Sequence, residues 1–124
     1  MRTISLLAII LVAALATNAQ VANTKWKATL HLDNPMDVIF DFGMDTLVVV
    51  NTQDNSTLET MKYSAQDSVL TIQKLSGMSV CDNSLTCKYK FGIQGDEMML
   101  TLIDDACNDR AQVLNNLKLN REKQ

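Results

Sequence analysis

The residues of this chain that could do chemistry are three cysteines and one histidine. Cys81, Cys87 and Cys107 are of the type that binds metals, acts as a reactive thiol or forms a disulfide. His31 is the only side chain of the type that usually serves as a base near neutral pH. A catalytic triad or a zinc site needs several such groups to converge, and one histidine does not supply them. We therefore expect no enzyme activity, no metal site and no cofactor.

The start of the chain predicts export. Arg2 is followed by the apolar run 4–15, which is too short to span a bilayer as a mature helix but matches the apolar core of a signal peptide. Small residues follow, and cleavage is expected after Ala19. Residues 1–19 are thus predicted to be a signal peptide and residues 20–124 one periplasmic or secreted domain. The first cysteine is Cys81, so we expect no lipid anchor on the mature protein.

An oxidising compartment predicts that two of the three cysteines form a disulfide. A bridge from Cys81 to Cys107 closes a loop of about 26 residues and would contribute roughly 3 to 4 kcal/mol. A bridge from Cys81 to Cys87 closes a smaller loop and contributes less. Loop size favours the longer bridge but does not decide the geometry. We expect a monomer, and a dimer linked through Cys87 stays open.

Apolar and polar residues alternate after Asn23, as in the strands of an antiparallel meander. In the first run Trp26 and Ala28 share one face, followed by Leu30 and Leu32. Strands are predicted over residues 25–32, 37–42, 47–50, 58–64, 68–74, 88–94, 97–104 and briefly around 117–119.

Two segments lack this alternation. Residues 75–86 are predicted to form one long loop, pinned by Cys81. Residues 107–114 fit a short helical turn, with Asp105 as its N-cap. Eight short sequential strands are enough to close a small barrel. The predicted fold is therefore an all-β, antiparallel, up-and-down eight-stranded barrel with a helical turn near the C-terminus.

Charge excludes two classes of partner. The chain has a net charge of −3, and Arg2 lies in the predicted signal peptide, so the mature domain is more acidic still. Basic residues are scattered except in the segment 121–123 at the C-terminus. Neither a stripe of positive charge for nucleic acid nor a polybasic patch for a membrane is present in the sequence.

The second half of the chain resembles the lipocalin-like barrel domains of exported Bacteroidetes proteins. The resemblance is carried by Cys81, Tyr89-Lys90-Phe91, Gly95-Asp96, Leu100-Thr101-Leu102 and Asp105-Ala106-Cys107-Asn108-Asp109-Arg110. Trp26 is similar to the tryptophan that opens the first strand of lipocalins and their calycin relatives. The resemblance implies that Arg110 packs on Trp26 at the barrel base, and that Cys81 and Cys107 form the barrel disulfide with Cys87 left over. Thr24 departs from the family, which has glycine two positions before the tryptophan.

A lipocalin-like barrel implies an exported, non-enzymatic binding protein for a small hydrophobic or amphipathic ligand. The large inward side chains of adjacent strands are the predicted lining, namely Phe40, Phe42, Met61, Tyr63, Tyr89, Phe91 and Met98. The alternative is an envelope module of the lysozyme-inhibitor type, which binds a protein partner through its loops around a packed interior. An interior of eight short strands is just wide enough for side chains to fill it, so both alternatives stay open.

Overall fold

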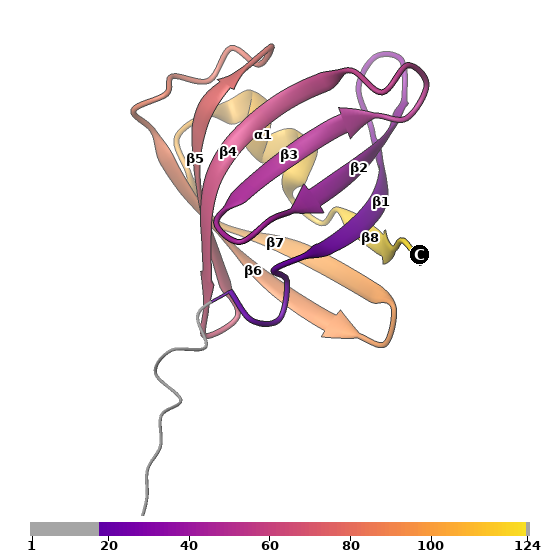
Figure 1. Ribbon diagram of the computed structural model, residues 1–124. Helices are drawn as coiled ribbons and strands as arrows, with labels where there is room; N and C mark the ends of the chain where they lie inside the picture. The colour runs from indigo at the N-terminus through magenta and orange to yellow at the C-terminus, as the bar shows by residue number, and fades with distance from the viewer. Residues whose placement is uncertain (1–17, 124) are drawn as a thin grey trace, which may run out of the picture.

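The computed structural model describes residues 18–123 of the chain (Figure 1). Within this range eight antiparallel strands follow one another as a meander and close into a barrel. The helix α1 (Asn108–Leu114) joins the last two strands. The strands are β1 (Thr24–Leu30), β2 (Met36–Phe42), β3 (Thr46–Asn51), β4 (Thr57–Gln66), β5 (Val69–Gly77), β6 (Thr86–Gln94), β7 (Glu97–Asp105) and β8 (Lys118–Arg121). The predicted all-β meander barrel, with its short helix near the C-terminus, is confirmed.

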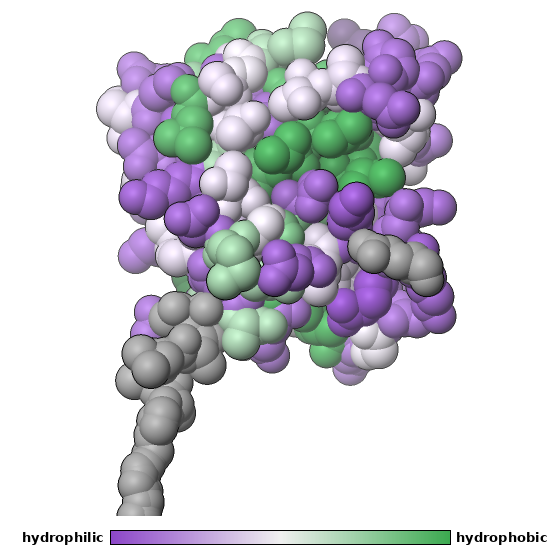
Figure 2. Space-filling view, viewed as in Figure 1, coloured by the Kyte–Doolittle hydropathy of each residue, from purple (hydrophilic) through white to green (hydrophobic). Residues whose placement is uncertain are grey.

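Period-two alternation is the reason that these segments form a barrel. Successive side chains of a strand point to opposite faces, so the apolar set of each strand meets inside the barrel while the polar set stays in water. In β1, for example, Trp26 and Ala28 are buried whereas Lys27 between them is exposed. On the outside, β2 and β3 also carry apolar residues such as Ile39 and Val50, which pair with each other and are half-buried. Figure 2 shows apolar residues gathered over these two strands.

Several predicted boundaries, and the predicted N-cap of the helix, differ from the structure. The first strand ends at Leu30, and Leu32 lies in the following loop with 43% of its surface exposed. The strand predicted to end at residue 74 continues to Gly77, because β5 keeps pairing with β4 up to the pair Glu59–Gly77. The long loop therefore starts at residue 78. The N-cap of α1 is Cys107, and the Asp105 carboxylate instead accepts a hydrogen bond from the Cys107 backbone N–H.

The predicted signal peptide, residues 1–19, lies outside the described residues except for Asn18 and Ala19. The backbone N–H of Asn18 donates to the carbonyl of Ala65 at 2.8 Å, and its side-chain amide donates to the carbonyl of Met44 at 2.9 Å. Val21 is buried in the core cluster. Residues 18–23 therefore cover one end of the barrel. Cleavage after Ala19 stays a prediction; it would remove the hydrogen bonds of Asn18 and keep Val21.

The arginine that packs on Trp26 is Arg121, so the expectation for Arg110 is wrong. The guanidinium carbon of Arg121 lies 4.4 Å from the centroid of the tryptophan ring. Strand register is the physical reason, because β8 places Arg121 opposite Trp26 in the ladder with β1. Arg110 lies at the start of α1, near the opposite end of the barrel, and pairs with Asp105.

The ladder between β1 and β8 is short, with only two residue pairs in the described structure, Trp26–Arg121 and Lys27–Asn120. Beyond these pairs α1 takes the place that a longer β8 would occupy (Figure 1). Its residues Arg110 and Leu114 are buried. The upper part of the barrel wall is thus closed by a helix, which ties the geometry of that end to the position of α1.

Replacement of Arg121 tests the stacking at the barrel base. We expect Arg121→Ala to lower the free energy of unfolding by about 1 kcal/mol, because the cation on the buried indole is lost. Urea denaturation monitored by tryptophan fluorescence measures the change. Lys118→Ala on the same strand removes only an exposed ion pair with Glu97, so we expect a change below about 0.5 kcal/mol. Equal effects of the two variants would contradict the assignment.

Candidate functional site

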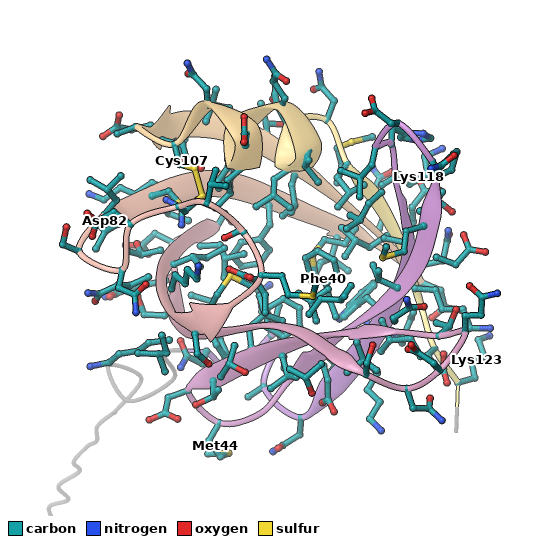
Figure 3. The ribbon with its side chains drawn as sticks, turned by 90° about the horizontal axis from the view of Figure 1, so that it is seen from above. Phe40, Met44, Asp82, Cys107, Lys118 and Lys123 are labelled. Atoms are coloured by element: carbon teal, nitrogen blue, oxygen red, sulfur yellow. A yellow bond between two sulfur atoms is a disulfide. The ribbon has the colours of Figure 1, made fainter. Side chains whose placement is uncertain are left out.

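An apolar cavity of about 400 Å³ opens at the end of the barrel that carries the 31–35 and 78–85 loops. Its wall comes from the upper halves of β1 to β4, from the 78–85 loop and from α1. The lining residues are Leu30, Leu32, Met36, Phe40, Val49, Leu58, Glu59, Met61, Met78, Ser79, Val80, Asp109, Arg110, Val113 and Leu114. Seen from above, Phe40 lies in the middle of the barrel, whereas Met44, Lys118 and Lys123 lie at its periphery (Figure 3).

Two of the seven predicted lining residues, Phe40 and Met61, line this cavity. The other five are buried in the hydrophobic core and are not part of its lining, namely Phe42, Tyr63, Tyr89, Phe91 and Met98. Phe42 and Tyr63 pack edge to face with ring centroids 5.1 Å apart, and the Tyr63 hydroxyl donates to the carbonyl of Gly43 at 2.6 Å. The lower part of the barrel is therefore filled by its own side chains.

The sequence prediction missed the residues at the rim of the cavity. Met78 and Val80 on the 78–85 loop are each 79% exposed, and Leu32 also faces solvent. Exposed apolar side chains that surround an apolar cavity mark a binding site more often than isolated ones do. The sequence does show two apolar residues, Met78 and Val80, in this segment. Because the segment has no regular alternation, the sequence alone does not indicate whether their side chains point inward or outward.

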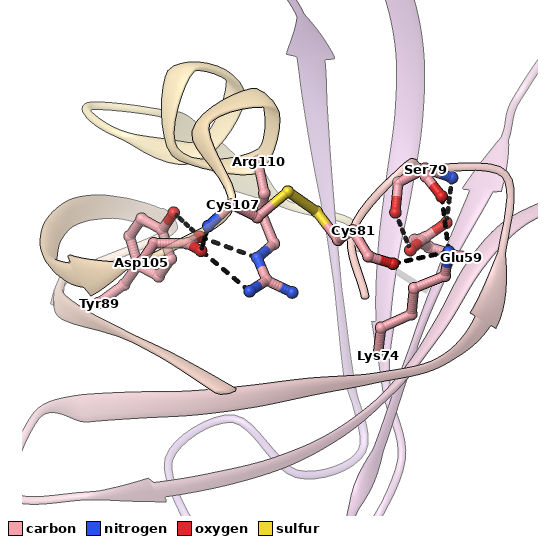
Figure 4. Close-up of a disulfide and its surroundings, with 8 residues drawn as sticks. All are labelled: Glu59, Lys74, Ser79, Cys81, Tyr89, Asp105, Cys107 and Arg110. Atoms are coloured by element: carbon pink, nitrogen blue, oxygen red, sulfur yellow. Dashed lines mark hydrogen bonds and ion pairs between the residues drawn. A yellow bond between two sulfur atoms is a disulfide. The ribbon is translucent and has the colours of Figure 1, made fainter. Parts of the chain in front are cut away.

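The predicted disulfide between Cys81 and Cys107 is present, with Cα atoms 5.7 Å apart (Figure 4). It joins the 78–85 loop to Cys107, the N-cap of α1. Both of these segments contribute lining residues to the cavity. The bridge therefore holds two sides of the cavity mouth at a fixed distance from each other.

A buried carboxylate, that of Asp105, organises the residues behind the disulfide. One oxygen, Oδ2, accepts hydrogen bonds from the Tyr89 hydroxyl at 2.6 Å and from Nε of Arg110 at 2.8 Å. The other oxygen, Oδ1, accepts from the Cys107 backbone N–H and from Nη2 of Arg110, both at 2.9 Å. Burial alone would raise the pKa of Asp105, but these hydrogen bonds together hold the pKa below its usual value.

Two further side chains fix the 78–85 loop from the opposite wall. The Lys74 ammonium is buried and donates to the carbonyls of Ser79 and Cys81 at 2.6 and 3.4 Å. The Glu59 carboxylate accepts from the hydroxyl and the backbone N–H of Ser79 at 2.7 and 3.0 Å (Figure 4). Neither Lys74 nor Glu59 was among the predicted site residues. Their roles depend on the loop folding over the end of β5, which the sequence pattern does not reveal.

The remaining thiol, Cys87, is buried on the inner face of β6, with 1% of its surface exposed. Burial raises the pKa of this thiol to about 12. A thiol with such a pKa is protonated at neutral pH and is a poor nucleophile. A disulfide between two chains through Cys87 would first require its exposure.

The histidine, the other chemical candidate, is not among the lining residues of the cavity. His31 is exposed in the loop that follows β1. Within residues 18–123, no three His, Cys, Asp or Glu side chains lie close enough together to hold a metal ion. In the same range, no helix has the length and apolar character needed to cross a bilayer.

A larger hollow of about 890 Å³ lies between β1, the end of α1 and β8, where the ladder of these two strands stops. It is lined by a mixture of polar and apolar groups, for example Lys27, Gln112 and Leu117. The mouth cavity is smaller but almost wholly apolar with only a few polar groups, which is the usual character of a ligand site. We therefore take the mouth cavity as the candidate site.

Comparison of the chain with protein-family models, with curated proteins and with solved structures found no match. The barrel itself is established by the strand pairing. Membership of the lipocalin-like family remains a proposal, which rests on the residue pattern and on this barrel.

Removal of the disulfide tests its role at the cavity mouth. We expect the double replacement Cys81→Ser and Cys107→Ser to lower the free energy of unfolding by about 3 kcal/mol, because the unfolded chain regains the freedom of the closed loop. Chemical denaturation measures this loss. Hydrogen exchange of the 78–85 loop should also accelerate. If exchange there stays unchanged while stability falls, the bridge does not hold the mouth.

Replacement of Asp105 tests the buried ion pair. We expect Asp105→Asn to lower the free energy of unfolding by about 3 kcal/mol at neutral pH, because Arg110 is left buried without its counter-charge. Because the pKa of Asp105 is lowered on folding, the contribution of its charge is present above about pH 4 and is lost as the pH falls further. Urea denaturation at several pH values should therefore show that the difference in the free energy of unfolding between the two proteins becomes smaller in acid.

Asp104→Asn is the matched control, since Asp104 is the exposed neighbour of Asp105 on the same strand. We expect this variant to unfold within about 0.5 kcal/mol of the unmodified protein at neutral pH. A gap between the Asp105→Asn variant and the unmodified protein that stays constant down to pH 2 would show that the charge of Asp105 does not carry the effect.

Proposed function

We propose that this protein is an exported, non-enzymatic binding protein of the lipocalin-like type, which holds a small hydrophobic or amphipathic ligand in the barrel mouth. The observation that carries the proposal is the apolar cavity of about 400 Å³ with its exposed apolar rim. A cavity of this size falls within the range of small-molecule sites, about 300 to 1,000 Å³. An intramolecular disulfide is compatible with export into an oxidising compartment.

The physical source of affinity is burial of apolar surface. A ligand that leaves water for this cavity gains about 25 cal/mol for each Å² of apolar surface that it buries. The disulfide and the hydrogen bonds of Lys74 and Glu59 to the 78–85 loop hold the rim in place before the ligand arrives. A preformed site needs less ordering on binding, so more of the gain appears as affinity.

The ionisable groups of the cavity support binding rather than catalysis. The carboxylate of Glu59 is bound to Ser79, and Arg110 is bound to Asp105. Groups held in structural hydrogen bonds are poorly placed to transfer protons to a substrate. Asp109, the remaining ionisable lining residue, is exposed on α1.

A protein-binding module of the inhibitor type is the second candidate. The observation in its favour is the exposure of Met78 and Val80 on a disulfide-pinned loop, since large apolar side chains held out in water are typical of a docking surface. In that case the rim, and not the interior, makes the contact. A pull-down with the Met78→Ser and Val80→Ser double variant as control tests this function, because a protein partner held by the rim would no longer be captured.

Filling the cavity tests the first candidate. Val49 points into the cavity from β3, whereas its neighbour Val48 points outward. We expect Val49→Phe to weaken binding of the fluorescent apolar probe N-phenyl-1-naphthylamine roughly tenfold or more, because the added ring takes the space of the ligand. Val48→Phe is the matched control and should bind the probe normally.

Native mass spectrometry of protein purified from its own host should in addition show a co-purifying small molecule. Absence of both probe binding and a co-purifying molecule would contradict the ligand-binding function.

A further inference from the structure

Among residues 18–123, Arg110 is the one cationic residue in the cavity lining, and it is held rigidly. Its side chain is only 7% exposed, and the two nitrogens Nε and Nη2 bind the two oxygens of Asp105. A guanidinium is planar and has five N–H donors in a fixed arrangement. Once Asp105 fixes two nitrogens, the direction of the third nitrogen is fixed as well.

That third nitrogen, Nη1, is buried and has no hydrogen-bond partner among residues 18–123. It points away from Asp105, toward the side of the view on which Lys74 lies (Figure 4). A buried donor without a partner is costly in free energy, and more so when the group is charged. An occupant of the cavity that offers an acceptor to Nη1 removes this cost.

The carboxylate oxygens of Asp105 and Glu59 already accept hydrogen bonds. Each oxygen of Asp105 accepts two hydrogen bonds, and both oxygens of Glu59 bind Ser79. The second buried cation, Lys74, donates to the carbonyls of Ser79 and Cys81. The site therefore offers a ligand the unused donor of Arg110, whereas the carboxylates of Asp105 and Glu59 are already hydrogen-bonded.

We infer that the ligand is an amphipathic molecule whose polar end carries an oxygen acceptor, a carboxylate or an ester carbonyl, and that Nη1 of Arg110 donates to this oxygen. The apolar chain of the ligand then lies along Phe40, Val49 and Met61. This inference rests on the proposed ligand-binding function and names the chemical class of the ligand. An amphiphile with a cationic ammonium end supplies only donors and leaves Nη1 unpaired.

Simple charge attraction makes the opposite prediction, which sharpens the test. Glu59 and Asp109 also line the cavity, and the whole chain has a net charge of −3. Long-range electrostatics alone would therefore favour a cationic amphiphile. A preference for acceptor-bearing ligands must come from the local donor of Arg110.

Three ligands with the same chain test the inference, namely dodecanoate, methyl dodecanoate and dodecylammonium. Each is titrated against the bound probe N-phenyl-1-naphthylamine at neutral pH, below the concentration at which it forms micelles. We expect dodecanoate or methyl dodecanoate, or both, to bind at least roughly tenfold more tightly than dodecylammonium, because only they accept from Nη1. Which of dodecanoate and methyl dodecanoate binds more tightly shows whether the site prefers a charged or a neutral acceptor.

If dodecylammonium binds as tightly as the better of the other two ligands, the inference is overturned. Binding of the probe in the same experiment would still support the proposed function. Failure of the probe and of all three ligands to bind would remove both.

Arg110→Lys separates the donor from the charge. Lysine keeps a cation near Asp105 but lacks the planar guanidinium with its several N–H donors. Its single ammonium group cannot donate to both oxygens of Asp105 and at the same time to a ligand in the cavity. We expect the affinity for the acceptor-bearing ligands to fall roughly tenfold, with the affinity for the apolar probe unchanged. Arg121→Lys, at the other end of the barrel, should change neither affinity.

Equal losses for all ligands and the probe would show that Arg110 only shapes the cavity, and would overturn the inference. If Arg110→Lys does not fold, the comparison of the three ligands on the unmodified protein still decides.

Discussion

The buried carboxylate of Asp105 is the interaction on which the upper half of this barrel depends. It joins β6 through Tyr89, the start of α1 through Cys107, and the cavity lining through Arg110. A buried charge is tolerated only when its hydrogen-bonding capacity is filled, and here four donors fill it. The same donors place the disulfide next to the carboxylate and leave one arginine nitrogen directed elsewhere (Figure 4).

The two ends of the barrel differ because they are closed in different ways. At the lower end, residues 18–23 and the stacking of Arg121 on Trp26 complete a packed core. At the upper end β8 is short and α1 closes the wall, while a disulfide-pinned loop lies beside the opening. Side chains do not fill the interior at this end, and a cavity of about 400 Å³ remains. The site is thus a consequence of how the barrel ends.

Much of the fold was predictable from the sequence because strand alternation is a local property. Trp26 and Phe40 can be assigned to inward faces from their own strands alone, since side chains of a strand alternate between two faces. Strand ends were less predictable, as Gly77 shows, because pairing with β4 extends β5 past the point where its own alternation ends. The candidate site was only partly predictable. Alternation along a strand shows which side chains point inward, but it does not show whether they lie near the open end of the barrel or in its packed part.

The sequence by itself determined the class of fold, the inward faces of most strands and the presence of enough cysteines for one disulfide. Tertiary structure alone decided that Arg121 rather than Arg110 covers Trp26, because strand register sets which residues meet across β1 and β8. It also decided that Phe40 and Met61 line a cavity while Tyr89 is buried in the core. Both outcomes depend on contacts between residues far apart in the chain, which local patterns of residue type do not contain.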